Sequence, residues 1–408
     1  MRIWYLSAYD QPRGQSTRTY DFSRELVRRG HNVTMFTNSY CHFTHVERLL
    51  PRERFRVEMV DGIRVIWLKT RPYRGNGLGR GLNMLDNVWR TLRASKALND
   101  RPDVVLGPSV PTLTGWAASW LATRFHVPFI FEVRDVWPDA LVDVGGLSKK
   151  SVVYYGLRHV EKMLYRKAAR ISSTLPHLSG HVVGSGSDPG KIVCIPNGID
   201  LSTFDLNANY DGAVGRQFVV MYVGGFGLDH DVPTIIRAAK ILQDAGDARF
   251  RFVVIGGGVR KASCEDEARS YQLRNIEFRN PIPKSSIPET QRGADILVAA
   301  ITDSKSYRFG LNLNKLCAYF ASARPVLFSG NPPNDPVLEA GAGLSVPAED
   351  PHAMVGGLKE LADMSAAERV EMGKRGLLYA QTTLSMDALG DCMEKMLASA
   401  IEEFKVVK

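Results

Sequence analysis

Short apolar runs alternate along this chain with longer stretches in which apolar residues recur at helical spacing. The apolar runs occupy residues 2–8, 32–37, 103–107, 128–133, 218–224, 251–258, 295–300 and 325–329. Each run is too short for an amphipathic helix and has the content of a buried strand. Strands separated by helix-length amphipathic stretches are typical of parallel sheets joined by crossover helices, so the pattern predicts an α/β fold.

The chain is long enough for two such domains. It has 408 residues, of which 44% are hydrophobic, and this is more than one ordinary core contains. A turn cluster, PNGID at 196–200, lies near the midpoint and precedes a polar stretch that continues to Arg216. We predict an N-terminal domain at 1–196, a C-terminal domain at 197–385 and a helical segment at 386–408. Doubly wound domains in series bring the carboxyl ends of their strands to facing edges, so a ligand-binding cleft is expected there.

The charge is unevenly distributed between the two halves. The first 196 residues contain 29 Lys and Arg against 16 Asp and Glu, whereas the remainder contains 23 against 27. A basic first half suggests an anionic partner such as lipid head groups, a phosphorylated molecule or nucleic acid, unless the charge serves solubility alone. We expect no nucleic acid partner, because no helix-turn-helix, zinc-finger or aromatic RNA-binding pattern accompanies the arginines.

The cysteines and the start of the chain indicate the compartment. The five cysteines are scattered and form no CxxC pair, which predicts neither a zinc site nor a disulfide framework. The apolar start is too short for a secretory signal, and the sequence contains no run of 18 apolar residues. These features predict a cytoplasmic protein.

The segment 307–326 carries the first candidate ligand site. Its loop ends at Gly310, and the residues that follow are apolar at helical spacing, which predicts a helix directly after a glycine turn. The unpaired N–H groups of a first helical turn attract anions. Arg308 and Lys315 flank that turn, so we predict a diphosphate site; the alternative is an ordinary surface turn before a core helix.

Three further glycine loops follow predicted strands and contain Gly14, Gly225 and Gly256. The last of them lacks the third glycine of a dinucleotide fingerprint, so a dinucleotide is not predicted. Asp229 and Asp231 imitate the Asp-x-Asp pair of metal-dependent enzymes. Two carboxylates alone make a poor metal cage, however, and we expect a solvated loop that binds no metal.

Several motifs, taken in order along the chain, resemble one enzyme family. They are PRGQSTR at 12–18, ELVRRGHNVTMFT at 25–37, EVRDVWPD at 132–139, PNGID at 196–200, YVGGFG at 222–227, RFVVIGGG at 251–258, NKLCAYFASARPVLFSG at 314–330 and GAGLSV at 341–346. This order is similar to that of retaining bacterial glycosyltransferases of the GT-B fold and the family 4 type. EVRDVWP and the basic glycine segment 71–85 further resemble a subgroup of N-acetylfucosamine transferases in O-antigen and capsule synthesis.

The resemblance implies a GT-B fold, in which two Rossmann-like domains face each other across a cleft. It implies that the C-terminal domain binds a nucleoside diphosphate sugar, usually a UDP-sugar, and that the N-terminal domain binds the acceptor and receives the final helix. The enzyme would use no cofactor and no metal, because basic side chains and a helix N-terminus meet the charge of the leaving diphosphate. The implied activity is transfer of a hexose-type sugar to a glycan or a polyprenyl diphosphate-linked acceptor in bacterial surface polysaccharide synthesis.

The sequence departs from the family at two places. The Glu-x7-Glu pair of the family falls here on Gly310 and Ala318, and the Arg and Lys that usually follow the first glycine loop of the C-terminal domain are replaced by residues 228–231. We predict that Arg308 and Lys315, with Arg18, supply the missing positive charge. The complete set of predicted donor-binding residues is Gly14, Arg18, Gly225, Gly256, Ile282, Arg308, Gly310, Leu311, Asn314, Lys315 and Glu339.

Each part of the donor has an expected position. We place uracil against the backbone of 281–283, the diphosphate on the Gly310 turn and the sugar under the Gly225 loop. Glu339 would contact the ribose or occupy a solvated helix position. Because no carboxylate nucleophile can be named, we predict attack on the face that the diphosphate leaves, rather than a covalent sugar–enzyme intermediate.

The candidate catalytic residues lie in the segment 132–139, directly after the apolar residues PFIF at 128–131. In a parallel sheet, residues directly after a buried strand stand at the ligand edge. We select Glu132, Arg134 and Asp135, with Asp135 orienting or deprotonating the acceptor hydroxyl. Arg134 would hold a phosphate or pair with Glu132.

The segment 151–171 is a basic amphipathic helix, which either rests on an anionic membrane or packs on the sheet with its charges in solvent. Together with the basic first half and the loop 71–80, it predicts a peripheral position on the inner face of the cytoplasmic membrane. Two other functions remain open, namely a nucleotide-sugar epimerase on the same scaffold and a non-catalytic nucleotide-sugar-binding partner.

Overall fold

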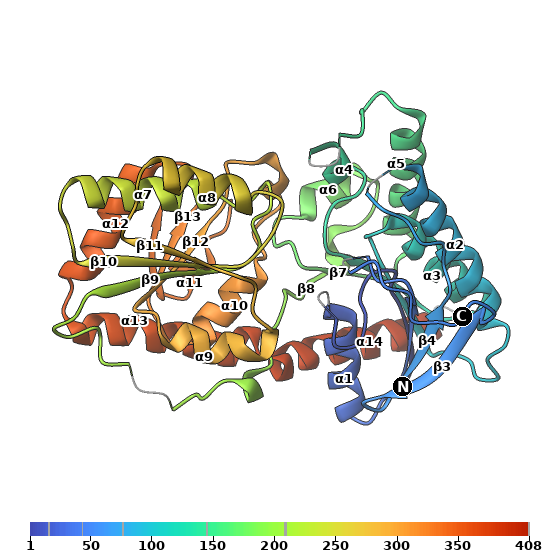
Figure 1. Ribbon diagram of the computed structural model, residues 1–408. Helices are drawn as coiled ribbons and strands as arrows, with labels where there is room; N and C mark the ends of the chain where they lie inside the picture. Colours follow the sequence, from blue (N-terminus) through green and yellow to red (C-terminus); the bar gives the residue numbers. More distant parts are fainter. Residues whose placement is uncertain (15–16, 43, 76, 144–145, 208–209, 407–408) are drawn as a thin grey trace. The chain divides into compact units, whose positions relative to one another are not determined.

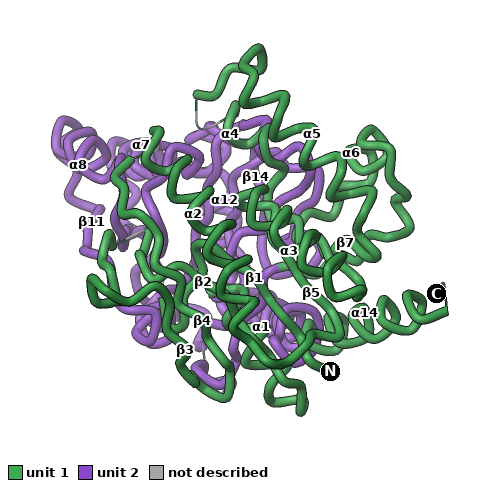
Figure 2. The backbone as a smooth tube through the Cα atoms, turned by 90° about the vertical axis from the view of Figure 1, so that its right-hand side faces the viewer, with its two compact units in different colours: residues 1–196, 389–408 green, residues 197–388 purple. Residues whose placement is uncertain are grey.

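A computed structural model describes the protein apart from residues 15–16, 43, 76, 144–145, 208–209 and 407–408. The chain divides into two compact units (Figure 2). Unit 1 comprises Met1–Pro196 and Leu389–Lys408, and unit 2 comprises Asn197–Ala388. Each unit has its own sheet and its own core.

The sheet of unit 1 has the strand order β3-β4-β2-β1-β5-β6-β7-β8. Its edge strands, β3 and β8, are labelled in Figure 1. Its strands are β1 Arg2–Leu6, β2 Asn32–Asn38, β3 Phe55–Val60, β4 Ile63–Leu68, β5 Val104–Pro108, β6 Phe129–Val133, β7 Arg170–Ser173 and β8 Ile192–Cys194. Neighbouring strands pair in parallel except for β3 and β4. The central strand β1 is buried from Ile3 to Leu6, as expected of a parallel strand covered by helices on both faces.

The helices of unit 1 connect successive strands. They are α1 Arg18–Arg28, α2 Leu78–Ser95, α3 Thr112–Phe125, α4 Asp139–Asp143, α5 Val152–Lys167 and α6 Ser179–Gly184, with a 3-10 turn, η1, at Pro189–Lys191. Helix α3 packs against α2 and against α5.

The sequence did not predict the antiparallel pair β3 and β4. Asp61 and Gly62 connect these strands with φ angles of 50° and 78°, the left-handed conformation that a two-residue hairpin turn requires. Strand β3 has no fully buried residue, so it lacks the continuous apolar run by which eight of the parallel strands were predicted. The short parallel strands β7 and β8 were not predicted either.

The sheet of unit 2 is parallel and has the order β11-β10-β9-β12-β13-β14. Its strands are β9 Phe218–Val223, β10 Phe250–Ile255, β11 Ile276–Arg279, β12 Ile296–Ala300, β13 Val326–Ser329 and β14 Gly343–Val346. The short strands β11 and β14 were not predicted. Side chains alternate between two cores. Val220 and Tyr222 pack in the cluster that contains α7 and α12, whereas Met221 and Val223 pack in the cluster that contains α10.

The helices of unit 2 are α7 Val232–Asp244, α8 Lys261–Ser270, α9 Ile287–Arg292, α10 Asn314–Ala321, α11 Pro336–Glu339, α12 Pro351–Asp363 and α13 Ala366–Tyr379. The shorter turns are η2 Leu201–Thr203, η3 Lys284–Ser286, η4 Lys305–Tyr307 and the π-helical η5 Ala380–Leu384. The predicted α/β class, with parallel sheets and crossover helices, is confirmed in both units.

The last helix, α14 (Met386–Val406), starts in unit 2 and belongs to unit 1 from Leu389 onward. Arg29, directly after α1, forms ion pairs with Asp391 and Glu394 on α14. His31 Nε2 lies 2.8 Å from the carboxylate of Glu394. The helix is therefore fixed to unit 1 by charge as well as by apolar packing. Within the described part of the chain, no helix is long and apolar enough to cross a membrane.

Candidate functional site

The loops at the carboxyl ends of β9 and β10 meet the start of α10 around Lys315. Lys315 Nζ donates a hydrogen bond to Tyr222 Oη over 2.7 Å and lies 4.2 Å from the centre of the Tyr222 ring. Tyr222 Oη in turn donates to the carbonyl oxygen of Gly225. One cation is thus connected through one hydroxyl to the glycine loop that follows β9.

Burial lowers the pKa of Lys315 to about 7, although the charge of Asp229 acts in the opposite direction. A largely desolvated ammonium is costly unless an anion compensates it. The site therefore favours a negatively charged ligand next to Lys315, and the affinity of Lys315 for a proton rises when such a ligand is present.

Two glycine loops enclose this cation without side chains. A methyl group at Gly224 would lie 3.0 Å from Lys315 Nζ, and one at Gly256 would lie 1.8 Å from the carbonyl oxygen of Gly224. Gly256 has a φ of 151°, which favours glycine. Phe226 N donates to Gly257 O at 2.9 Å, so the two loops also pair through their backbones. The predicted donor-binding glycines Gly225 and Gly256 are therefore brought together with Lys315.

The carboxylates of the Asp-His-Asp segment at 229–231 have partners within unit 2. Tyr307 Oη donates to Asp229 Oδ2 at 3.2 Å, and Asp231 accepts from Thr234 N at the start of α7. Among the residues that the structure describes, no cluster of His, Cys, Asp or Glu has the arrangement of a metal site. The expectation of a solvated loop is wrong for Asp231, which is buried as a helix cap.

His230 belongs to the same cluster, although it was not selected from the sequence. Its Nδ1 lies 2.6 Å from the carbonyl oxygen of Gly225. Burial, followed by the charge of Lys315, lowers the pKa of His230, so the ring is neutral at neutral pH. A neutral imidazole on the glycine loop can exchange hydrogen bonds with a sugar hydroxyl.

The predicted loop before α10 is confirmed as a glycine turn followed by a helix. Gly310 is buried with a φ of 114°, and Leu311 N donates to Asn334 Oδ1 at 2.6 Å. No side chain caps α10 at Leu313, and Asn314, the first helical residue, is exposed. The first turn of α10 thus presents backbone N–H groups beside Lys315.

The remaining predicted donor residues of unit 2 lie around this cluster. Arg308 is exposed and stacks on Phe309, with its guanidinium carbon 4.6 Å from the ring centre. Ile282 is half-buried in the core beneath the loops, and its neighbour Pro281 packs next to Gly257. Glu339 is exposed at the end of α11, where it accepts from Tyr379 Oη at 3.4 Å.

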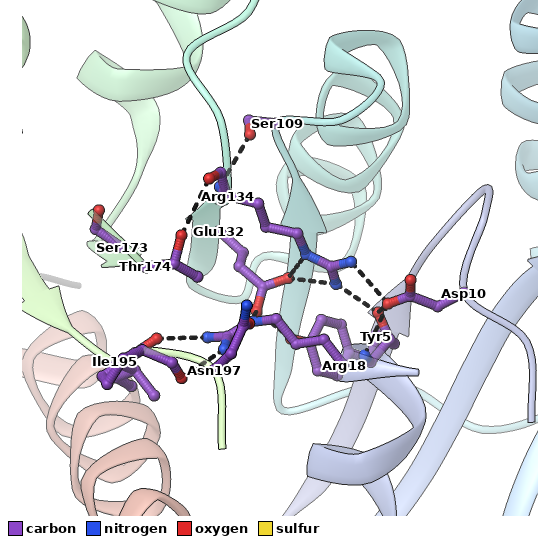
Figure 3. A network of polar contacts seen from close by, with 12 residues as sticks. Tyr5, Asp10, Arg18, Ser109, Glu132, Arg134, Ser173, Thr174, Ile195 and Asn197 are labelled. Atoms are coloured by element: carbon purple, nitrogen blue, oxygen red, sulfur yellow. Dashed lines mark hydrogen bonds and ion pairs between the residues drawn. The ribbon is translucent and has the colours of Figure 1, made fainter. Parts of the chain in front are cut away.

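In unit 1, Glu132 at the end of β6 is the centre of a buried network (Figure 3). Its Oε1 accepts from Tyr5 Oη and from Arg18 Nε at 2.9 Å, and its Oε2 accepts from Arg134 Nε at 2.8 Å. Burial opposes ionisation of Glu132, but the charges of Arg134 and Arg18 outweigh burial and lower its pKa. The carboxylate is therefore a fixed anion with both oxygens in use.

Arg134 and Arg18 connect this carboxylate to other segments of unit 1. Arg134 Nη1 lies 2.7 Å from Asp10 Oδ2, and Arg134 Nη2 donates to Thr19 Oγ1 at 2.6 Å. Arg18 Nη2 and Nη1 donate to the carbonyl oxygens of Ile195 and Pro196 at 2.7 and 2.6 Å. The network thus joins β1, α1, β6 and the last residues before unit 2.

This geometry bears on three predictions. Glu132 is fully buried and both of its carboxylate oxygens are bonded, so its predicted catalytic role does not fit. For Arg134, the pairing with Glu132, which is one of its two predicted roles, is present. Arg18, predicted to bind the donor, is buried and engaged with Glu132 and two carbonyl groups. Charged residues directly after a strand are expected at the ligand edge of the sheet. Here, however, charged side chains from three segments form ion pairs with one another and are shielded from solvent.

Asp135 is the predicted catalytic residue that remains exposed. Ser109 Oγ donates to the carbonyl oxygen of Asp135 at 2.8 Å and accepts from Arg134 N at 3.1 Å, which fixes the backbone after β6. Gly14 lies in the loop before α1, where its N–H donates to Gln11 O at 3.0 Å. Gln15 and Ser16, the next residues of that loop, lie outside the described residues.

An aromatic cluster at the carboxyl edge of the same sheet was missed from the sequence. His42 Nδ1 lies 2.6 Å from Tyr73 Oη, and the His42 ring lies 5.0 Å from the Tyr9 ring. Arg80 Nε donates to Tyr9 Oη at 3.1 Å and its guanidinium lies 5.8 Å from the Trp137 ring centre. Burial, then the charges of Arg80 and His45, lower the pKa of His42 to about 4. These residues follow different strands, so sequence spacing gives no signal that they meet.

Comparison with known proteins agrees with this arrangement. Residues 13–198 match a family model described as glycosyl transferase 4-like domain, and residues 208–379 match one described as glycosyl transferases group 1. The chain is 23% identical over 389 residues to a D-inositol 3-phosphate glycosyltransferase of Kineococcus radiotolerans, covering 90% of this chain and 86% of that protein.

Two further relatives are similar at the same level. The probable glycosyltransferase WbjE of Pseudomonas aeruginosa is 24% identical over 79% of this chain and 82% of its own length. The putative colanic acid biosynthesis glycosyl transferase WcaI of Escherichia coli is 24% identical over 44% of this chain and 46% of its own length.

Solved structures share the fold over nearly the whole chain. Sucrose-phosphate synthase of Thermosynechococcus elongatus superposes with a TM-score of 0.74 at 18% identity, covering 98% of this chain and 99% of that one. Anabaena Alr3699/HepE, solved with UDP and glucose, has a TM-score of 0.69 at 12% identity, covering 98% and 100%. With two Rossmann-like units and both family matches, this chain belongs to the GT-B glycosyltransferases and consists of a glycosyl transferase 4-like domain followed by a group 1 domain.

Proposed function

We propose that the protein is a retaining glycosyltransferase that moves a sugar from a UDP-sugar to a glycan or lipid-linked acceptor in bacterial surface polysaccharide synthesis. The observation that carries the proposal is the position of Lys315, which lies against two glycine loops and the uncapped first turn of α10. Surface polysaccharide synthesis is supported by the description of one relative as a colanic acid biosynthesis enzyme.

The diphosphate of the donor is assigned to the start of α10. Backbone N–H groups of a first helical turn and an ammonium beside them bind a diphosphate and stabilise the charge that develops on it as it leaves. This arrangement replaces the Glu-x7-Glu pair that is absent at Gly310 and Ala318. Arg308 supplies a second positive charge on the same loop, and no metal or cofactor is required.

The loops around Lys315 suggest positions for the sugar, the uracil and the ribose of the donor. The sugar is placed under the Gly225 loop, where His230 is available for a hydroxyl group, and uracil is placed at residues 281–283 next to Gly257. Glu339 is exposed and available to the ribose. UDP is the nucleotide proposed because Anabaena HepE, which shares the fold, was solved with UDP.

The acceptor is assigned to unit 1. Asp135 is exposed at the carboxyl edge of the sheet and orients the acceptor hydroxyl. Tyr9 provides an aromatic face, and Arg80 provides positive charge for the phosphate of a lipid-linked acceptor. We propose that such an acceptor is reached on an anionic membrane surface at the inner face of the cytoplasmic membrane.

The retaining course is proposed from the resemblance to retaining glycosyltransferases, and the lack of a suitable nucleophile bears on how retention would be achieved. A covalent intermediate needs an accessible carboxylate beside the anomeric carbon, and Glu132 is enclosed by Tyr5, Arg18 and Arg134. The alternative function, an epimerase, would need a pair of accessible carboxylates, and the enclosed Glu132 cannot be one of them. We therefore favour attack from the face that the diphosphate leaves, with a diphosphate oxygen accepting the proton.

The test is UDP release from a panel of UDP-sugars, with the anomeric configuration of the product read by NMR. Lys315→Ala should abolish release and the thermal stabilisation by UDP. Lys305→Ala is the matched control, because Lys305 is an exposed lysine of the same loop and should retain both signals. Unchanged UDP binding by Lys315→Ala would contradict the assigned donor site, and an inverted product would contradict retention.

A further inference from the structure

Helix α2 of unit 1 has its polar and apolar faces the opposite way round from an ordinary surface helix. Four large apolar residues, which we call the outer stripe, recur at helical spacing and are exposed. They are Leu78, Leu82, Leu85 and Trp89, with exposed fractions of 90%, 45%, 55% and 53%. The buried face instead contains Asn83, Asn87 and Thr91. A helix on a globular domain normally buries its apolar stripe.

Hydrogen bonds hold α2 in this orientation. Asn83 Nδ2 donates to Thr70 Oγ1 at 2.9 Å and to the carbonyl oxygen of Arg71 at 2.6 Å. Asn87 Nδ2 donates to Asn38 Oδ1 at 2.7 Å, and Asn87 Oδ1 accepts from Thr114 Oγ1 at 2.9 Å. Rolling α2 to bury the outer stripe would break these buried bonds and leave polar groups unsatisfied. The outward position of the stripe is therefore a stable feature of the fold.

Basic residues surround the outer stripe. Residues 71–96 contain Arg71, Arg74, Arg80, Arg90, Arg93 and Lys96, against one acid, Asp86. The guanidinium carbons of Arg90 and Arg93 lie 5.5 and 5.3 Å from the centre of the Trp89 ring. An exposed row of Leu and Trp with arginines beside it is the composition of a helix that lies in a membrane interface.

We propose that the outer stripe inserts into the interfacial region of an anionic membrane, with Arg90 and Arg93 at the lipid phosphates. The proposal rests on the lipid-linked acceptor proposed above and specifies which surface of the enzyme approaches it. A second copy of the chain is a poorer occupant, because packing stripe on stripe would bring two sets of arginines together. The partner is thus an apolar layer with negative charge at its boundary, which an anionic bilayer provides.

The position of α2 in the fold fits this partner. Arg80, on the first turn of α2, donates to Tyr9 Oη and stacks over Trp137, two residues after Asp135. The same helix therefore carries the outer stripe and contacts the residues to which the acceptor is assigned. A lipid carrier in the bilayer at the stripe would place its phosphate within reach of Arg80.

The stripe on α2 replaces α5 as the candidate membrane surface. The sequence predicts an apolar face at Val153, Leu157, Val160, Leu164 and Ala168; Leu164 and Ala168 are buried, while Leu157 and Val160 are half-buried. Three apolar residues at the start of α5 remain exposed, namely Val152, Val153 and Tyr155. They provide a set of three on the same unit for comparison with three residues of the outer stripe.

The experiment is vesicle sedimentation of the full chain without donor or acceptor. Vesicles of phosphatidylcholine alone are compared with vesicles that also contain phosphatidylglycerol. The stripe variant is Leu82→Gln/Leu85→Gln/Trp89→Gln, and the matched control is Val152→Gln/Val153→Gln/Tyr155→Gln. Both sets lie in solvent-exposed helix positions where Gln is well tolerated.

We expect the wild-type protein and the α5 control to bind the anionic vesicles, and the stripe variant to bind about tenfold more weakly or worse. Arg90→Gln/Arg93→Gln should weaken binding by about fivefold for each charge removed, and added salt should have a similar effect. Brominated lipids should quench the fluorescence of Trp89, and this quenching should be absent in the Trp89→Phe variant. Normal binding by the stripe variant, or equal binding to both kinds of vesicle, would overturn the proposal.

Two further readouts separate the possible failures. Light scattering that shows a dimer for the wild type and a monomer for the stripe variant would assign the stripe to a second copy and overturn the membrane proposal. UDP release and thermal stabilisation by UDP, measured without vesicles, should be the same for the stripe variant and the wild type. Their absence in both proteins, with vesicle binding intact, would count against the proposed glycosyl transfer and not against the membrane surface.

Discussion

Lys315 and Tyr222 are 93 positions apart in the sequence, yet the ammonium of one lies on the ring of the other and donates to its hydroxyl group. The pair holds a cation at the point where the glycine loops and the start of α10 converge. Because that cation is largely shielded from water, its protonation depends on whether an anion is present. This relationship leads to the first prediction.

Binding of UDP is expected to be coupled to proton uptake. An anion beside Lys315 raises the pKa of its ammonium from about 7, so above that pH the complex takes up a proton that the unliganded protein lacks. The affinity for UDP should therefore fall as the pH rises through about 7. Calorimetry in buffers of different ionisation enthalpy, one pH unit above that pKa, measures the uptake. Lys315→Met should show only the contribution of the UDP phosphate, and equal heats in all buffers for the wild type would contradict the coupling.

Gly256→Ala should destabilise unit 2 and weaken donor binding. The added methyl group would lie 1.8 Å from the carbonyl oxygen of Gly224, and the φ of 151° is unfavourable for alanine, so a cost of about 3 kcal/mol is expected. Gly356→Ala is the control, because nothing lies within 4 Å of the added group and α12 should gain about 0.5–1 kcal/mol. Urea unfolding measures both. A wild-type midpoint for Gly256→Ala would show that the glycine loops are not in contact.

Glu132→Gln separates a structural role from a catalytic one. Removing the carboxylate charge leaves Arg18 and Arg134 beside a neutral group in a buried position, and loss of one partner of a buried ion pair costs about 3–5 kcal/mol. We expect a lower melting temperature for unit 1, with activity lost in proportion to unfolding. A variant that melts like the wild type but is inactive would restore Glu132 as a catalytic residue.

Asp135→Asn should lower activity without lowering stability, which is the opposite of the result expected for Glu132→Gln. Its side chain is exposed, so the melting temperature and UDP affinity should remain those of the wild type. Loss of a group that orients the acceptor hydroxyl lowers kcat by about 10²-fold. Asp139→Asn is the comparison in the same segment, because Asp139 begins α4 four residues later and its carboxylate accepts from Tyr154 Oη at 2.9 Å. Equal loss in both variants would show that the effect comes from the segment and not from Asp135.

Most of the fold could be predicted because its strands are buried on both faces. The apolar run at 218–224 corresponds to β9, for example, and it is continuous since helices cover both sides of the sheet. The exposed strand β3 gives no such signal and was missed. Helix α2 is the informative exception: the sequence indicated a basic loop at 71–80, whereas α2 begins at Leu78, and nothing in the sequence shows that its polar side faces the protein.

The candidate site could be predicted only where it is local in sequence. The turn at Gly310 and the helix that carries Lys315 are consecutive, so loop and helix signals sufficed. The partner of Lys315, Tyr222, comes from another strand and could not be inferred from spacing. Glu132 was misassigned for a related reason, because its burial depends on Arg18, which reaches it from 114 positions away.

The return of α14 to unit 1 affects the order in which the protein is completed during synthesis. Residues 1–196 leave the ribosome without the helix that pairs with Arg29 and His31, and all of unit 2 is made before that helix emerges. Unit 2 can thus acquire its native contacts first, although it is encoded second. An N-terminal fragment that ends at the unit boundary would expose the surface on which Leu389, Met393 and Leu397 are buried, and would be prone to aggregate on the way out of the ribosome.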